Sequence, residues 1–155
     1  MTRLGGCIDP DPAYLWERGL RTFPLRVEQA SANAKAFAEW LTTCPEVEAV
    51  SFPGVSNPLP AWLLGGGAVV AFRVKRGDAH ADSVLKHLRL IQAASSLGGV
   101  ETRASNPYNT SHKQFTPEQR AEMGILPGTV RLAVGTEAFA DLKTDLESAF
   151  RLSNE

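Results

Sequence analysis

The segment Ser95-Ser96-Leu97-Gly98-Gly99-Val100-Glu101 decides how the rest of the chain is interpreted. It follows the apolar run 88–94, which is short enough to be a buried strand. Two serines and two glycines stand where that strand should end, and glycines there allow a tight turn and a close backbone approach to a ligand. A plain strand exit through small turn residues explains the same motif, so its meaning depends on the rest of the chain.

The composition is typical of one globular domain. The 155 residues are enough to bury a core, and 43% of them are hydrophobic and 21% charged. The formal net charge of -1 predicts no general attraction for nucleic acid or for an anionic membrane. Cys7 and Cys44 are too few for a disulfide framework or a zinc site. Because residues 1–6 lack a signal-peptide core and no apolar run is long enough to span a membrane, we expect a cytoplasmic protein.

Hydrophobic periodicity predicts an α+β domain with helices packed on one face of a small mixed sheet. Apolar residues at three- and four-residue spacing predict helices over 25–43, 78–87, 117–124 and 138–152. Apolar or alternating runs predict strands over 47–52, 68–74, 88–94 and 128–135. A helical segment at 13–20 carries several large apolar residues with little chain before it to cover them, so we expect it to pack against a missing partner.

Arg131 is the sharpest candidate for a binding residue. Val130, Leu132 and Val134 share one face of the predicted strand, so Arg131 lies on the opposite face. Burying an arginine in such a strand is unfavourable unless its guanidinium meets an anion, and the planar fork suits a carboxylate. An exposed arginine, or an internal salt bridge with a residue such as Glu101 or Glu137, explains the same pattern.

Six motifs occur along the chain in one order. They are Arg18–Arg26, Phe52-Pro53-Gly54, Ser96–Glu101, the polar segment that ends in Ser111-His112, Arg131–Glu137 and Asp141–Leu146. With these motifs in register, the chain resembles the Cys/Met-metabolism family of pyridoxal-phosphate (PLP) enzymes over nearly its whole length. This family comprises the trans-sulfuration enzymes, among them cystathionine γ-synthase, cystathionine β- and γ-lyases and methionine γ-lyase.

The resemblance implies a specific fold and a division of the chain. It implies the small C-terminal domain of a fold-type I PLP enzyme, preceded by the interdomain helix. Residues 1–24 would be that helix and the tail of a cofactor domain, and residues 25–155 the substrate-side domain. The reaction implied is β- or γ-elimination or replacement on a sulfur amino acid, such as cystathionine, methionine or an activated homoserine.

The resemblance also implies substrate-binding residues. The arginine that matches Arg131 binds the α-carboxylate of the amino-acid substrate, and the serine that matches Ser96 assists it. Ser111 keeps a hydroxyl where the family has a pocket-lining threonine, whereas Asn106 replaces a histidine. Ser95 matches a position, directly before the serine, at which the residue type varies with substrate specificity in the family. The particular sulfur amino acid and the choice between β and γ chemistry stay open.

The cofactor is expected outside this chain. The family holds PLP as a Schiff base to a lysine of the large domain, and the lysines here do not match that motif. We therefore assign no catalytic, cofactor-binding or metal-binding residue, and expect the chain to be inactive without a cofactor-binding domain or a separate chain that supplies it. A homo-oligomer is expected by analogy with the family. A stand-alone amino-acid-binding or regulatory module and a non-functional remnant are the alternatives.

Overall fold

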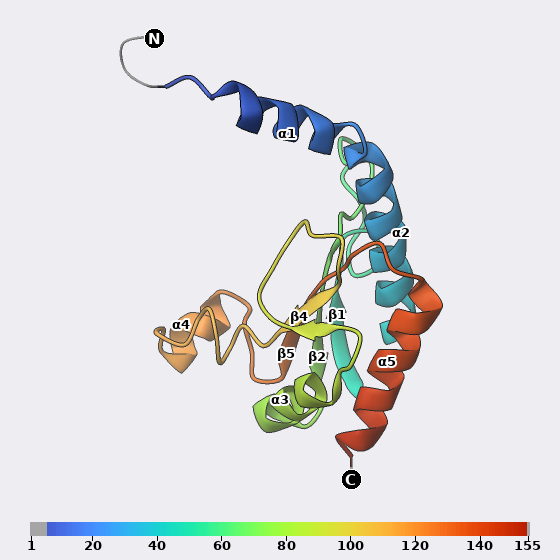
Figure 1. The fold of residues 1–155 in the computed structure, drawn as a ribbon. Coiled ribbons are helices and arrows are strands. Elements are labelled where there is room, and N and C mark those ends of the chain that lie inside the picture. Colours follow the sequence, from blue (N-terminus) through green and yellow to red (C-terminus); the bar gives the residue numbers. More distant parts are fainter. Residues whose placement is uncertain (1–5, 155) are drawn as a thin grey trace.

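The computed structural model describes residues 6–154, which form helices around one mixed sheet (Figure 1). The sheet has five strands in the order β1-β2-β5-β4-β3. They are β1 (Val47–Ser51), β2 (Val69–Val74), β3 (Gln92–Ala93), β4 (Arg103–Ser105) and β5 (Thr129–Ala133). Neighbouring strands are antiparallel except β3 and β4, which are parallel. The α+β class and the mixed sheet predicted from the sequence are confirmed.

Three helices cover one face of this sheet. They are α2 (Phe23–Leu41), α3 (Gly77–His87) and α5 (Phe139–Leu152), and the described chain also contains α1 (Pro10–Leu20) and α4 (Pro117–Glu122). Alternate residues of the central strands, such as Phe72 and Leu132, are buried against α2, α3 and α5. Because side chains alternate along a strand, the residues between them point to the other face. We call this second face the polar face, and it carries Arg103, Ser105 and Arg131.

Two connecting segments lie on the side of the sheet away from α5 (Figure 1). One is the 95–101 loop, and the other is the 106–128 segment that contains α4. Helix α4 begins at Pro117, where the sequence predicts a helix to start. A capping box stabilises this end, because Thr116 Oγ1 accepts a hydrogen bond from Gln119 N and Gln119 Oε1 accepts one from Thr116 N. Gly124 follows the helix with a φ of 75°, a conformation that glycine adopts most readily.

The strand predicted over 88–94 is wrong in extent and in burial. Only Gln92 and Ala93 pair with a neighbouring strand, and both are exposed because β3 forms the edge of the sheet. The backbone N–H groups of residues 89–91 instead donate to the carboxylate of Asp145, at 2.8–3.0 Å. Ile91 alone among the large apolar residues of this run is fully buried. Strand β4 was not predicted, because three residues are too few for a periodic pattern.

Helix α1 extends away from the rest of the molecule (Figure 1) and has no buried residue. Tyr14, Leu15 and Trp16 are each more than 60% exposed. The uncovered apolar surface predicted for this segment is therefore confirmed. Within residues 6–154, no helix is both long enough and apolar enough to cross a membrane.

Candidate functional site

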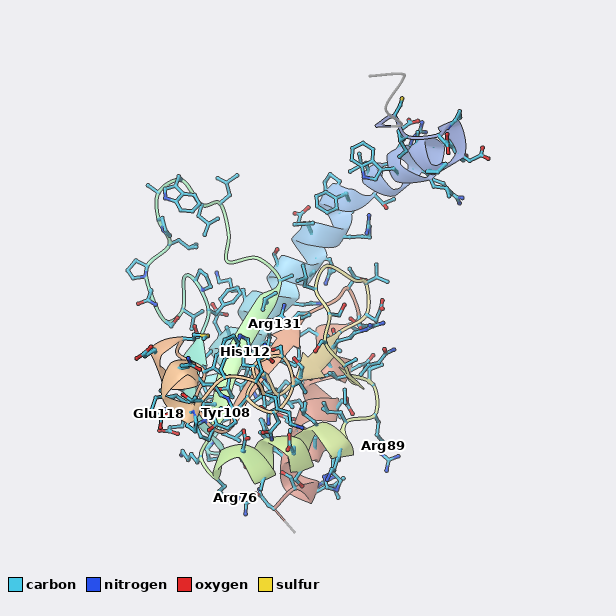
Figure 2. All side chains as sticks on the ribbon, turned by 90° about the vertical axis from the view of Figure 1, so that its left-hand side faces the viewer. Arg76, Arg89, Tyr108, His112, Glu118 and Arg131 are labelled. Carbon is cyan, nitrogen blue, oxygen red and sulfur yellow. The ribbon has the colours of Figure 1, made fainter. Side chains whose placement is uncertain are left out.

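Arg131 lies near the middle of the polar face. It sits on β5, between Ala71 of β2 and Ser105 of β4 in the strand register. Figure 2 views the molecule from the side on which α4 lies, and Arg131 is visible within the sheet. Among residues 6–154, no carboxylate lies within salt-bridge distance of its guanidinium. Arg131 is thus a partly exposed cation without a protein anion.

The two glutamates considered as internal partners of Arg131 bind elsewhere. Glu101 Oε1 pairs with Arg103 Nη2 at 2.7 Å. The Glu101 backbone N–H, followed by the Arg103 charge, lowers the pKa of this carboxyl below its usual range, so it stays ionised beside Arg103. Glu137 accepts hydrogen bonds from the backbone N–H and the hydroxyl of Thr102. The salt-bridge interpretation of Arg131 is therefore wrong for both residues.

Ser105 is a candidate site residue that the sequence analysis did not identify. It faces Arg131 directly across β4 and β5, and such pairs bring Cβ atoms to about 5 Å. The residue is only 7% exposed, and its hydroxyl makes no hydrogen bond with another residue of the described chain. In the sequence, only the polar-apolar-polar alternation Arg103-Ala104-Ser105 indicates that Ser105 lies on the polar face of a strand. That alternation can be interpreted only when the register with β5 is known.

Ser95 and Ser96 leave the sheet beside this pair. Ala93 is in register with Ala104, and Ala94 N donates to Ala104 O at 2.9 Å. The two serines follow Ala94 directly after the end of β3, and β4 lies between β3 and the strand of Arg131. Ser96 is half-buried and Ser95 is exposed. The structure thus places the start of the 95–101 loop at the edge of the sheet, two strands from the arginine.

Ser111 lies further out, in the turns that follow β4. It is exposed, and its Oγ lies 2.9 Å from His112 Nδ1. Arg120 holds this segment, since its Nε donates to His112 O at 3.0 Å and its guanidinium stacks on the Tyr108 ring, 4.2 Å from the centroid. Figure 2 shows Tyr108 and His112 on this side of the molecule. In the part of the chain that is described, Ser111 makes no hydrogen bond with Arg131.

Asn106, immediately after β4, fixes where these turns begin. The residue is 1% exposed, and its Nδ2 donates to Asp78 at 3.1 Å and to Asp82 at 2.8 Å, both on α3. Its Oδ1 accepts from Tyr108 N at 3.0 Å. Asn106 therefore acts as a connector between α3 and the segment that carries Ser111, a role that its sequence position alone did not indicate.

The lysines of the chain do not fit a Schiff base to PLP. A lysine in that role is desolvated next to the cofactor. Here four are exposed, and the fifth is paired with Glu147 at 3.6 Å: Lys35, Lys75, Lys86, Lys113 and Lys143. None belongs to a strand of the sheet, and within residues 6–154 no three His, Cys, Asp or Glu side chains gather as a metal site would require. In residues 6–154 the strands of the polar face thus carry arginines and a serine but no lysine.

A family model described as "Cys/Met metabolism PLP-dependent enzyme" matches residues 1–151, nearly the whole chain. The chain belongs to this PLP-dependent family. The identification confirms the resemblance drawn from the six motifs, and the fold agrees with it.

Individual members of the Cys/Met metabolism family are similar to the chain over part of their length. L-methionine gamma-lyase of Pseudomonas deceptionensis is 37% identical over 153 residues, which cover 95% of this chain and 38% of the relative. Yeast cystathionine gamma-lyase superposes with a TM-score of 0.87 at 33% identity, covering 99% of this chain and 41% of that one. Cystathionine gamma synthase of Xanthomonas oryzae, solved with cystathionine, has a TM-score of 0.80 at 35% identity, covering 88% of this chain and 37% of that one. The chain therefore spans about two fifths of the length of these relatives.

Proposed function

We propose that the chain is the C-terminal, substrate-side part of a PLP-dependent trans-sulfuration enzyme. Its reaction class would be β- or γ-elimination or replacement on a sulfur amino acid, such as cystathionine, methionine or an activated homoserine. PLP, when bound, supplies the electron sink that such reactions need at the amino-acid Cα. The residues of this chain bind and orient the substrate, and Arg131 receives its α-carboxylate.

One observation carries this proposal: Arg131 is a cation on the polar face without an anion in the described structure. A guanidinium presents two parallel N–H donors to a carboxylate, which fixes the orientation of the ligand as well as its position. Ser105 lies next to it across β4 and β5, so a further donor is available to the same carboxylate, and the serine-bearing loop follows β3 on the other side of β4. Ser96, Ser95 and Ser111 are proposed as the remaining substrate-side residues.

The division of the chain is part of the proposal. Residues 1–24 would join the substrate-side domain, residues 25–155, to a cofactor domain that supplies the Schiff-base lysine. The exposed apolar side chains of α1 support this, because a helix with Leu15 and Trp16 in solvent gains free energy by packing against a partner. The length of the relatives supports it too, since the chain covers only 38% of the methionine gamma-lyase.

The proposal is tested by titrating PLP and recording the visible absorbance band of lysine-bound cofactor. The titration is done on the chain alone, and then on the chain joined to or mixed with a cofactor domain of the family. A band in the second sample only, with turnover of a sulfur amino acid, is the expected result. If turnover by the second sample were no greater than that of the cofactor domain alone, the proposed role would be wrong. Calorimetry with free amino acids would then test for a stand-alone binding module.

A further inference from the structure

Two carboxylates bind the chain on either side of the 95–101 loop, and the bond from Ala94 N to Ala104 O, at 2.9 Å, holds the residue directly before Ser95. At the entrance, Asp145 of α5 accepts the three backbone N–H groups of residues 89–91. At the exit, Glu137 accepts from Thr102 N at 2.5 Å and from Thr102 Oγ1 at 2.8 Å. Between the anchors, residues 95–99 make no backbone hydrogen bond to another described residue. The position of Ser96 therefore depends on where the two ends of the loop are fixed.

The Thr102 hydroxyl is central to the anchor at the exit. The side chain is fully buried. Its Oγ1 donates to Glu137 and at the same time accepts from Gly135 N at 2.9 Å. The hydroxyl therefore serves both as donor to the Glu137 carboxylate and as acceptor for Gly135 N–H. Removing its oxygen would leave that buried N–H and that carboxylate oxygen without this partner. Thr136 N adds a bond to Val100 O at 2.8 Å.

The same network reaches back to α2. Asn33 is 4% exposed, and its Nδ2 donates to Gly135 O at 3.1 Å and to Glu137 O at 2.8 Å. Gln29, one turn earlier on α2, donates to Asn33 Oδ1 at 3.1 Å. A Cβ at Gly135 would overlap Val100 O and Glu137 Oε2, so this close approach requires glycine.

We propose that Thr102 and Glu137 are positioning residues for the substrate site. Residues 134–137 directly continue the strand that carries Arg131, so the bonds to Thr102 attach the Ser96 loop to that same strand. The network fixes the distance between the serine-bearing loop and the arginine, and Asn33 makes α2 its outer support. This inference rests on the proposed function, because it assigns a purpose to the relative position of Ser96 and Arg131.

The first test uses hydrogen exchange on the 155-residue chain. Thr102→Val keeps the shape of the side chain and removes the hydroxyl, whereas Thr102→Ser keeps the hydroxyl. We expect the amides of Thr102, Gly135 and Thr136, which donate within this network, to exchange at least about tenfold faster in Thr102→Val, with those of β2 and β5 unchanged, and near-normal exchange in Thr102→Ser. Thr144→Val, which removes an exposed hydroxyl on α5, is the matched control. Equal exchange of these three amides in Thr102→Val and Thr102→Ser would overturn the inference.

The second test uses the PLP-loaded enzyme that contains this chain. Thr102→Val should raise KM for the amino-acid substrate about five- to tenfold with a smaller change in kcat, and Thr102→Ser should restore KM. If Thr102→Val does not fold, Glu137→Ala at a half-buried position replaces it in both tests, with the same expected results. If KM is unchanged in Thr102→Val while kcat/KM falls in Arg131→Ala, the inference alone is overturned. If kcat/KM is unchanged in Arg131→Ala, the proposed function is overturned instead.

Discussion

Arg131 and Arg73 show how two arginines on one face of a sheet can differ in what they are able to bind. Arg73 donates to both carboxylate oxygens of Glu48, at 2.8 and 2.9 Å, so its fork is occupied. Arg131 has no such partner in residues 6–154. The difference arises from register, because Arg73 lies beside the edge strand β1, which carries Glu48, whereas Arg131 lies between an alanine and a serine.

This contrast gives a matched pair of variants. Arg131→Ala should lower kcat/KM of the PLP-loaded enzyme roughly ten- to a hundredfold. The loss of a charged hydrogen-bond pair to the substrate carboxylate should reduce transition-state stabilisation by about 1.5–3 kcal/mol. Arg73→Ala removes an arginine from the same face and should leave kcat/KM within about twofold. Steady-state kinetics at fixed PLP concentration measure both. A normal kcat/KM for Arg131→Ala would exclude the proposed contact.

Ser105 is expected to add a second, weaker contact to the same carboxylate. Ser105→Ala should raise KM by about tenfold or less, since the hydroxyl is an uncharged donor that makes one hydrogen bond to the carboxylate, whereas the guanidinium is charged and can make two. Ser51→Ala is the control, because Ser51 is exposed on the edge strand and pairs with Ala71 in the same row of the sheet. KM values for the two variants are measured under one set of conditions. Equal KM values would show that Ser105 lies outside the substrate's reach.

At the scale of the elements, α1 and α2 differ in what they pack against. The second half of α2 buries Ala34, Phe37 and Leu41 in the core, whereas α1 has no buried residue. The exposed apolar side chains continue from α1 into the first turn of α2, where Phe23 and Leu25 are 50% and 68% exposed. Exposed apolar side chains therefore occur along α1 and at the start of α2, the region that the proposal assigns to the join with a cofactor domain.

Polar substitutions on α1 should separate folding from association. Leu15→Gln with Trp16→Gln should leave the Tm of the isolated chain unchanged, because neither side chain is buried in it. The same pair should weaken binding to a cofactor domain of the family by at least about tenfold, measured by calorimetry. Trp62→Gln, in an exposed loop elsewhere, is the control and should bind normally. Normal binding by the double variant would contradict the proposed role of residues 1–24.

The strands and helices were predictable to different degrees. Helices α2 and α5 and strands β2 and β5 were found from the sequence because long periodic patterns identify an element and its buried face. Strands β3 and β4 have two and three residues, so the pattern contains almost no periodicity. Strand β4 depends on its pairing with β5, and β3 depends on its pairing with β4 and on Asp145, which holds the preceding chain. Both β5 and Asp145 come from distant parts of the sequence.

At the scale of the whole molecule, His80 couples the fold to pH. The His80 side chain is 7% exposed. Arg76 donates to its Nδ1 and also to Ser153 O, which belongs to the C-terminal end of the chain. An arginine can only donate, so Nδ1 must be the unprotonated acceptor in the folded state. Burial first, and the Arg76 charge second, lower the pKa of His80 below its usual value.

The sign of the pH effect follows from this shift. The unfolded chain binds a proton to His80 near pH 6.5 and the folded chain binds it only at lower pH, so the free energy of unfolding should fall as pH drops below about 6.5. The contribution should be complete above that pH and level off below the folded-state pKa. His80→Asn keeps an acceptor and removes the titration. Denaturant unfolding between pH 8 and pH 5 should show a larger loss in the wild type than in His80→Asn, and parallel curves would contradict this role.

The sequence by itself determined the family, the class of fold and the arginine at its centre. These follow from local patterns: ordered motifs, apolar periodicity, and an arginine placed opposite the buried face of a strand. Only the tertiary structure decided that Glu101 and Glu137 bind elsewhere, that Ser105 stands beside Arg131, and that Thr102 ties the Ser96 loop to the strand of the arginine. The physical reason is that strand register joins Ser105 to Arg131 and a hydrogen bond joins Thr102 to Glu137, 35 positions away, and no periodicity within the chain encodes which distant residues meet.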